Sequence, residues 1–127
     1  MERYIIDTNV FSDFLNHSFS QNGMRFLSNL IDSDSKISII TKIELLCWKT
    51  DLNSEFWIKE FISKSDVIGI NDSVVQNCIK IRRFKKIKTP DAIIAATALT
   101  FDYTIITNNT KDFENIENLK FLNPYKL

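Results

Sequence analysis

Two hydrophobic patterns follow one another along the chain. Short runs of apolar and β-branched residues predict strands buried on both faces, whereas apolar residues spaced three or four positions apart predict helices with one buried side. The predicted strands are residues 4–6, 36–40, 66–70, 103–107 and 119–122, the last of them at an edge. The predicted helices carry their apolar residues within 10–15, 26–31, 41–46, 56–62, 74–79 and 89–99. This alternation predicts an α/β fold with an open, mostly parallel five-stranded sheet and helices on both faces.

The length and composition are those of one globular domain. The 127 residues are enough to bury a core, and 44% of them are hydrophobic while 25% are charged. No repeat, linker or low-complexity segment divides the chain, so we interpret residues 1–127 as a single domain. No apolar run approaches the length of a membrane span, and the first residues do not form a signal peptide. We therefore expect a cytoplasmic protein with no membrane contact.

Several kinds of chemistry are excluded by the residues that are scarce. The two glycines exclude a glycine-rich phosphate loop. The only histidine, His17, lies in a polar loop and is interpreted as a surface residue, which argues against a Ser-His-Asp triad. Cys47 and Cys78 lie in apolar helical patterns and are expected to be buried free thiols in a reducing compartment. Enzymatic chemistry in this chain would therefore depend on carboxylates.

The charge is balanced overall but locally uneven. The net charge is zero and the isoelectric point is about 6.6, so any binding of a polyanion must come from a local cluster of cations. Six of the sixteen lysines and arginines fall within residues 80–88, among them Arg83, Lys85 and Lys86, with Phe84 and Ile87 between them. This basic strip is either a solvated helix face or a phosphate-binding surface.

Three acidic residues lie where a strand ends or a helix begins, and each has a simple structural explanation. Asp7 follows the first strand, and either Asp7 or Asn9 can cap the helix behind it. Glu44 has the spacing of a capping box with Thr41. Asp91 is expected at the second position of a helix that Thr89 caps, where a negative charge favours the helix dipole.

A shared position on the sheet gives the same three acids a functional interpretation. In an open parallel sheet, strand ends and helix starts collect on one rim, which is where ligands bind. Carboxylates gathered there resist ionisation unless a cation compensates them. Their hard oxygen atoms suit Mg²⁺ or Mn²⁺, and such an ion can polarise a phosphodiester and lower the pKa of an attacking water.

Four stretches of the sequence resemble those of a known protein family. The matching stretches are residues 6–10, 41–45, 90–96 and 107–113. Their order and separations resemble those of the PIN-domain family, and within it the VapC-type toxins of bacterial type II toxin–antitoxin modules. The resemblance covers nearly the whole chain. It implies a PIN-like five-stranded parallel sheet, a Mg²⁺- or Mn²⁺-dependent endoribonuclease acting on RNA, a small inhibitory antitoxin protein as partner, and a homodimer.

The resemblance also assigns site residues. Carried over by position, Asp7, Glu44 and Asp91 are the metal-binding and catalytic acids. Asn109 matches a position where the family often has a fourth acid, and its amide brings no charge. We therefore expect three carboxylates with one tightly held ion, with Asn109 as a neutral fourth member. Asp112, beside the apolar Phe113, is interpreted as capping the segment that follows it.

Two other interpretations stay open. A PIN-like module that binds RNA or protein without catalysis would keep the fold but not the turnover. A receiver-like phosphoacceptor domain would need its acceptor aspartate at the end of the third strand, where the sequence has Asp72. The aromatic residues Phe56, Trp57 and Phe61 are expected to belong to the core or to a subunit interface.

Overall fold

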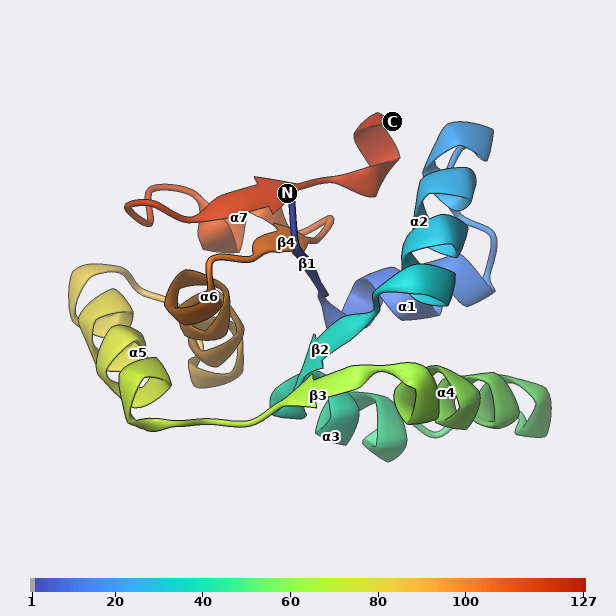
Figure 1. The fold of residues 1–127 in the computed structure, drawn as a ribbon, viewed down its shortest axis with the longest axis horizontal. Coiled ribbons are helices and arrows are strands. Elements are labelled where there is room, and N and C mark those ends of the chain that lie inside the picture. The colour runs from blue at the N-terminus through green and yellow to red at the C-terminus, as the bar shows by residue number, and fades with distance from the viewer. Residues whose placement is uncertain (1) are drawn as a thin grey trace.

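The computed structural model describes residues 2–127 and has five short strands. They are β1 (Tyr4–Ile6), β2 (Lys36–Ser38), β3 (Asp66–Ile68), β4 (Thr104–Ile106) and β5 (Lys120–Leu122). Strands β1, β4 and β5 form a parallel sheet in the order β1-β4-β5, and β2 pairs in parallel with β3. Strands β1 and β2 touch without forming a hydrogen-bonded ladder (Figure 1). The predicted α/β class is confirmed, whereas the sheet is divided into two parts instead of being continuous.

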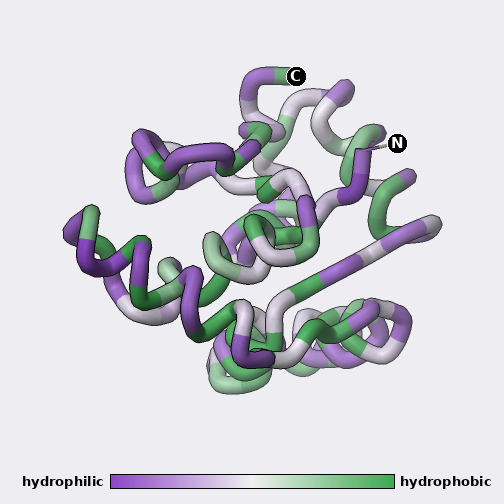
Figure 2. The backbone as a smooth tube through the Cα atoms, turned by 60° about the vertical axis from the view of Figure 1, so that its left-hand side comes forward, coloured by the Kyte–Doolittle hydropathy of each residue, from purple (hydrophilic) through white to green (hydrophobic). Residues whose placement is uncertain are grey.

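Helices lie on both sides of these strands (Figure 1). The helices are α1 (Thr8–Leu15), α2 (Gln21–Ser33), α3 (Ile39–Cys47), α4 (Leu52–Lys64), α5 (Asp72–Phe84), α6 (Thr89–Phe101), α7 (Thr110–Phe113) and the final 3₁₀ turn η1 (Pro124–Lys126). Figure 2 shows hydrophilic and hydrophobic residues alternating along the helical turns, as expected for helices with one buried side. Within residues 2–127, no helix is both long and apolar enough to cross a membrane.

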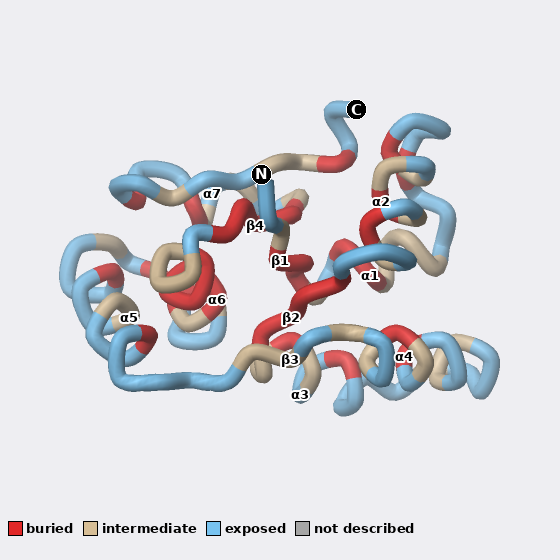
Figure 3. Tube along the Cα trace, in the orientation of Figure 1, coloured by how far each residue is buried: buried red, intermediate tan, exposed pale blue. Residues whose placement is uncertain are grey.

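Successive residues of the central strands face two separate cores. Ile5 and Ile105 pack with buried residues of α5 and α6, whereas Ile6 and Ile106 pack with those of α1, α2 and α4. All four side chains are at most 1% exposed. Each such burial contributes roughly 1.5–3 kcal/mol, and the buried strands appear at the centre of the molecule in Figure 3. The prediction that these strands are buried on both faces is confirmed.

Helix α3 begins earlier than the sequence pattern suggests. The side chain of Ser38 accepts a hydrogen bond from the Ile40 amide at 3.1 Å, so Ser38 ends β2 and caps a helix that starts at Ile39. Thr41 is therefore buried inside the helix, and the predicted capping box of Thr41 and Glu44 is wrong. The change leaves the Glu44 side chain free for another contact.

Helix α6 also begins one residue earlier than predicted. Its cap residue is Lys88, which makes no side-chain capping bond, and Thr89 is the first helical residue. Asp91 is thus the third residue of the helix, and the predicted second position is wrong. The helix beyond it is buried almost all round, as Figure 3 shows, which agrees with its uniformly apolar sequence.

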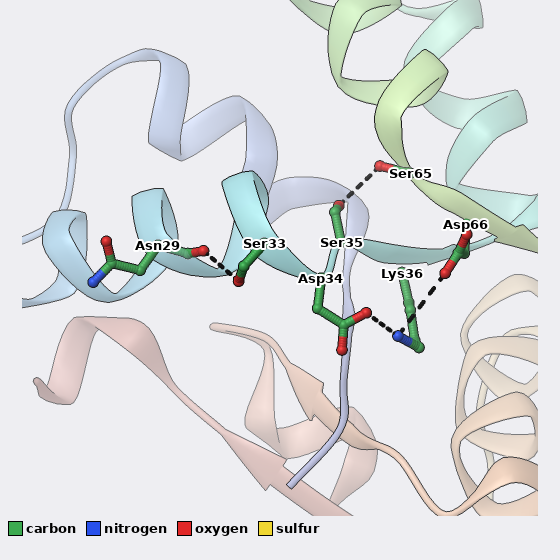
Figure 4. A network of polar contacts seen from close by, with 7 residues as sticks. All are labelled: Asn29, Ser33, Asp34, Ser35, Lys36, Ser65 and Asp66. Atoms are coloured by element: carbon green, nitrogen blue, oxygen red, sulfur yellow. Dashed lines mark hydrogen bonds and ion pairs between the residues drawn. The ribbon is translucent and has the colours of Figure 1, made fainter.

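The amino end of the strands carries a buried lysine. Lys36 is 6% exposed and forms an ion pair with Asp34, while its ammonium lies 4.0 Å from Asp66 (Figure 4). Lys36 and Asp66 are paired in the β2–β3 register. The same ammonium lies 5.9 Å from the ring centre of Tyr103, which precedes β4. Lys36 therefore connects the two parts of the sheet.

Predictions for six other side chains have mixed outcomes. Cys47 is exposed and Cys78 is half-buried, so burial is wrong for Cys47, although both thiols are free as predicted. His17 is exposed, as predicted. In α4, Phe56 and Trp57 are 56% and 49% exposed and do not belong to the core. Their neighbour Phe61 does, because it is 4% exposed and its ring stacks on that of Phe11 at 3.9 Å.

Candidate active site

Asp7 occupies the turn between β1 and α1. Its Oδ1 accepts a hydrogen bond from the Thr8 amide at 2.8 Å, and its Oδ2 accepts one from the Thr107 hydroxyl at 2.8 Å. The residue is 6% exposed. Burial raises the pKa of Asp7, the bonds from Thr107 and Thr8 partly offset this, and the charges of Glu44 and Asp112 raise it further. Asp7 therefore caps α1, as the structural interpretation proposed, while remaining part of a negatively charged site.

Glu44 reaches the same site from α3. Its Oε1 lies 2.6 Å from the Thr8 hydroxyl, which in turn lies 3.1 Å from the hydroxyl of the buried Thr41. A hydroxyl has one proton, and the carboxylate can only accept it, so Thr8 donates to Glu44. This bond connects the helix after β1 to the helix after β2. It holds Glu44 at the carboxyl end of the strands.

Asp91 completes the set of predicted acids. It lies in the first turn of α6 and is partly buried. Burial raises the pKa of Asp91 to about 6, with further contributions from the charges of Asp7, Asp112 and Glu44, while Lys88 acts in the opposite direction. The three negative neighbours show that the acids are electrostatically coupled.

Asn109 joins the site after β4. Its backbone N–H donates to the Thr107 hydroxyl at 3.0 Å, and its side-chain Nδ2 donates to Asp112 Oδ2 at 2.5 Å. Phe113 is 1% exposed and anchors this turn. The prediction that Asp112 caps the following segment is wrong, because Asp112 lies inside α7, where its carboxylate holds the Asn109 amide. Its charge also acts on Asp7 and Asp91.

One pocket collects the four predicted residues. It has a volume of about 400 Å³ and is lined by Asp7, Thr8, Asn9, Ser12, Glu44, Leu45, Trp48, Asp91 and Asn109. Asp72, which a receiver-like site would need, lies outside it at the start of α5. The pocket therefore favours an acidic site over a phosphoacceptor aspartate.

The donors in this pocket suit a hard metal ion, although they are not drawn together. Carboxylates, an amide and hydroxyls are the oxygen ligands that Mg²⁺ and Mn²⁺ prefer. In the part of the chain that the structure describes, no three His, Cys, Asp or Glu side chains form a ready-made metal cluster. Like charges repel, and Glu44 is held by Thr8. The residues fit such an ion by their chemistry.

A comparison with known families agrees with this architecture. The family model for the PIN domain matches residues 4–119, which includes all four pocket residues that the sequence predicted. The chain belongs to the PIN domain family. The family resemblance noted from the sequence is thereby confirmed.

Individual proteins and solved structures also resemble this PIN domain. It is 42% identical over 57 residues to a protein named Ribonuclease VapC from Rickettsia bellii, and the match covers 42% of each chain. A toxin–antitoxin complex from Klebsiella pneumoniae contains a chain with a TM-score of 0.77 and 27% identity, covering 98% of this chain and 99% of that one. A chain of the DNA-bound VapBC from Salmonella typhimurium has a TM-score of 0.78 at 23% identity, with coverage of 98% and 99%. The last similarity establishes the fold alone.

The basic strip of this PIN domain lies outside the acid pocket. Arg83, Lys85 and Lys86 line a separate shallow hollow of about 330 Å³ at the end of α5. Lys85 has a structural contact, because its ammonium donates to the carbonyls of Lys111 and Glu114 at 2.8 and 2.7 Å. Arg83 and Lys86 are exposed. Of these three residues, Lys85 therefore anchors α7, and the other two face solvent.

Two threonines in this PIN domain were missed by the sequence interpretation. Thr107 is fully buried and follows Ile106, which pairs with Ile6 in the β1–β4 register. Asp7 and Thr107 therefore occupy equivalent positions on neighbouring strands, a relation that the two strand patterns already contained. Thr8 had no such signal, because its contact with Glu44 depends on how α1 and α3 meet.

Proposed function

We propose that this protein is a metal-dependent endoribonuclease and the toxin of a toxin–antitoxin pair. The main support is the pocket in which Asp7, Glu44, Asp91 and Asn109 come together, with the pKa of Asp91 raised by burial and by its acidic neighbours. The similarity to a protein named Ribonuclease VapC supports the same activity. With RNA as substrate, the protein would work in the cytoplasm.

Asp7, Glu44 and Asp91 would hold a Mg²⁺ or Mn²⁺ ion. When bound, the ion would polarise the phosphodiester and favour ionisation of an attacking water. Thr107 and the Thr8 amide orient the Asp7 carboxylate, and the Thr8 hydroxyl orients Glu44. The Asn109 amide nitrogen is engaged with Asp112, so its carbonyl oxygen is the group that can accept a hydrogen bond from substrate or water.

Cleavage of RNA with and without metal tests this proposal. Wild-type protein should cut a mixed-sequence RNA in Mg²⁺ or Mn²⁺ and lose activity in excess chelator. Asp7→Asn should reduce cleavage at least about 100-fold while the protein stays folded, because removal of the charge weakens the hold on the dication. Asp102→Asn is a matched control. The Asp102 side chain is 89% exposed. Its backbone has a φ of 59°, a left-handed conformation that asparagine also tolerates.

Full activity in chelator, or in the Asp7→Asn protein, would contradict the proposal. If the wild type binds RNA but never cuts it under any metal condition, the protein is the non-catalytic PIN-like binding module. Isothermal calorimetry without RNA adds a further test. We expect one tight ion, because Asn109 supplies no fourth charge to the pocket.

Arg83 and Lys86 would bind the RNA backbone, since both are exposed and line the hollow at the end of α5. Reversing both to Glu should weaken RNA binding and flatten the dependence of log affinity on log salt by roughly 0.7 for each phosphate that is no longer neutralised. Lys85 is also assigned to this surface, but it is best left intact in the experiment because its reversal would release α7. An unchanged slope would mean that the strip is only a solvated face.

A small antitoxin protein is the proposed partner, and an apolar hollow between α1, α2 and α4 is a suitable place for it. The hollow measures about 440 Å³ and its apolar lining is Phe11, Phe14, Leu15, Ile31, Trp57 and Phe61. The similarity to a chain of a toxin–antitoxin complex supports the assignment. Co-expression with the adjacent small reading frame should suppress toxicity and give a co-purifying complex, and Trp57→Glu should prevent both. A homodimer is proposed as well, and light scattering of the purified protein would test it.

A further inference from the structure

Trp48 stands in the wall of the acid pocket with much of its indole exposed. It directly follows α3, and its exposed fraction is 38%. On one side it lines the pocket that contains Asp7, Glu44 and Asp91. On the other it borders a smaller hollow of about 160 Å³ whose lining includes Leu45, Ile58 and Lys59. Tryptophan is usually much more deeply buried, so a large aromatic surface at this position needs an explanation.

The acid pocket creates a problem for any polyanion that binds there. Three carboxylates repel phosphate, and four of the six cations of the basic strip line a different hollow, while Lys88 acts on Asp91 without lining the acid pocket. A nucleobase carries no charge, and every base presents a flat face that can stack on an aromatic ring. Trp48 is the aromatic side chain among the residues that line this pocket. It offers an attraction that the negative charge does not weaken.

We propose that Trp48 stacks against an unpaired base next to the phosphodiester that is cut. The substrate would then have to be single-stranded at this point, because the faces of paired bases are covered by their neighbours in a duplex. Asn9 and Ser12 line the same pocket and place polar groups beside the indole. The inference deepens the proposed ribonuclease function, on which it rests, by assigning one specificity contact and one structural class of RNA.

The chain offers a built-in comparison, because its two tryptophans line different hollows. Trp57 is 49% exposed and borders the hollow between α1, α2 and α4. Trp57→Phe leaves Trp48 as the only tryptophan, and Trp48→Phe leaves Trp57. A single-stranded 2′-O-methyl RNA, added in chelator so that nothing is cut, should quench the fluorescence of Trp48 and leave that of Trp57 unchanged.

Binding affinity gives the second measurement. Trp48→Ala should weaken binding of the single-stranded RNA roughly tenfold, a typical loss for a stacked base, without changing the salt slope, since the indole neutralises no phosphate. Trp48→Phe should retain most of the affinity because it keeps an aromatic face, and Phe56→Ala, which removes another exposed aromatic ring, should behave like the wild type. Duplex RNA of the same sequence should bind with equal affinity to the wild type and to Trp48→Ala.

Four results of the RNA-binding measurements would overturn the inference. They are an undiminished affinity of Trp48→Ala, equal quenching of both tryptophans, equal quenching by duplex RNA, and no RNA binding by the wild type. Protection of Trp48 by the antitoxin but not by RNA would also overturn it and assign the residue to the protein partner. Because these measurements use no cleavage, a protein that stacks RNA but fails to cut it contradicts the nuclease proposal and leaves the stacking inference standing.

Discussion

Buried charges at the two ends of the sheet have opposite electrostatic surroundings. At the amino end, the ammonium of Lys36 meets Asp34 and Asp66, so the buried charge has partners of opposite sign. At the carboxyl end, Asp7 and Asp91 face other acids, and burial and like charge raise the pKa of both. A buried charge is expensive unless it is paired. The paired end has the character of a structural contact, and the end with like charges is where the cation is proposed to bind.

The largest expected effect comes from removing the paired lysine. Lys36→Ala should lower the free energy of unfolding by about 2 kcal/mol, because a buried stem is removed along with its charge. The cost stays moderate because the side chains of Asp34 and Asp66 are 49% and 77% exposed and can rehydrate. Lys36→Met keeps the stem and should lose less. Urea denaturation measures both changes, with Lys64→Ala, in an exposed pair with Glu60, as a control that should be nearly neutral.

Equal losses in Lys36→Ala and Lys64→Ala would remove the distinction between the two ends of the sheet. A Lys36→Ala protein that stays fully stable yet cannot cut RNA would also remove the distinction, because Lys36 would then contribute to activity and not to stability.

Asp91→Asn should have the opposite effect on stability and raise the free energy of unfolding at high pH. The pKa of Asp91 is about 6 in the folded protein against an ordinary value of 3.8, so its contribution to stability is fully present below about pH 4 and is lost as the pH rises through 6. At pH 8 the metal-free Asp91→Asn protein should therefore be more stable than the wild type by about 1 kcal/mol, allowing for solvent screening of a partly exposed group. At pH 4 the difference should vanish. Thermal melts in chelator at both pH values measure it, and a destabilised mutant at pH 8 would contradict it.

The smallest expected effect concerns Asp112, which affects the site through its charge. Asp112→Asn should lower the pKa of Asp91, because one of the charges that raise it is removed. Carbon-detected NMR titration of the Asp91 carboxyl measures the shift. Asn109→Asp is the matched reverse change, since it adds a charge to the same turn and should raise that pKa while tightening metal binding in the absence of RNA. An unchanged pKa of Asp91 in both variants would mean that charges in the turn of Asn109 and Asp112 do not act on the acid site.

The sequence predicted which acids come together in this site, because the ends of the strands and the acidic residues that follow them could be identified at the same time. Asp7 follows a fully apolar strand, and the position of Asp91 behind a proline indicated a helix start. Both residues reach the pocket as expected. The class of fold followed from the same alternation, since period-two and period-3.6 patterns report burial directly.

Other features depended on competition between neighbouring residues. Ser38 and Thr41 are both good helix caps, and only packing decides that Ser38 is used and that Thr41 is buried. Lys36 has a charge that normally predicts exposure, yet it is buried because Asp34, Asp66 and Tyr103 lie around it. No pattern in the sequence singled out Trp48, and its position in the pocket wall depends on the end of α3 at Cys47.

The missing ladder between β1 and β2 has a consequence for how the protein opens. Backbone amides of β2 and β3 are bonded separately from those of β1, β4 and β5, so the two parts can exchange their amide hydrogens as distinct cooperative units. Asp7 follows β1 and Glu44 follows β2 across that seam, with the Thr8 hydroxyl as the bridge. A partial separation of the two units would take the Asp7 and Glu44 carboxylates apart and open the core in which Ile6 packs with α4, while the core of Ile5, Ile105, α5 and α6 stays folded. Activity should therefore fall at lower denaturant concentrations than global unfolding does.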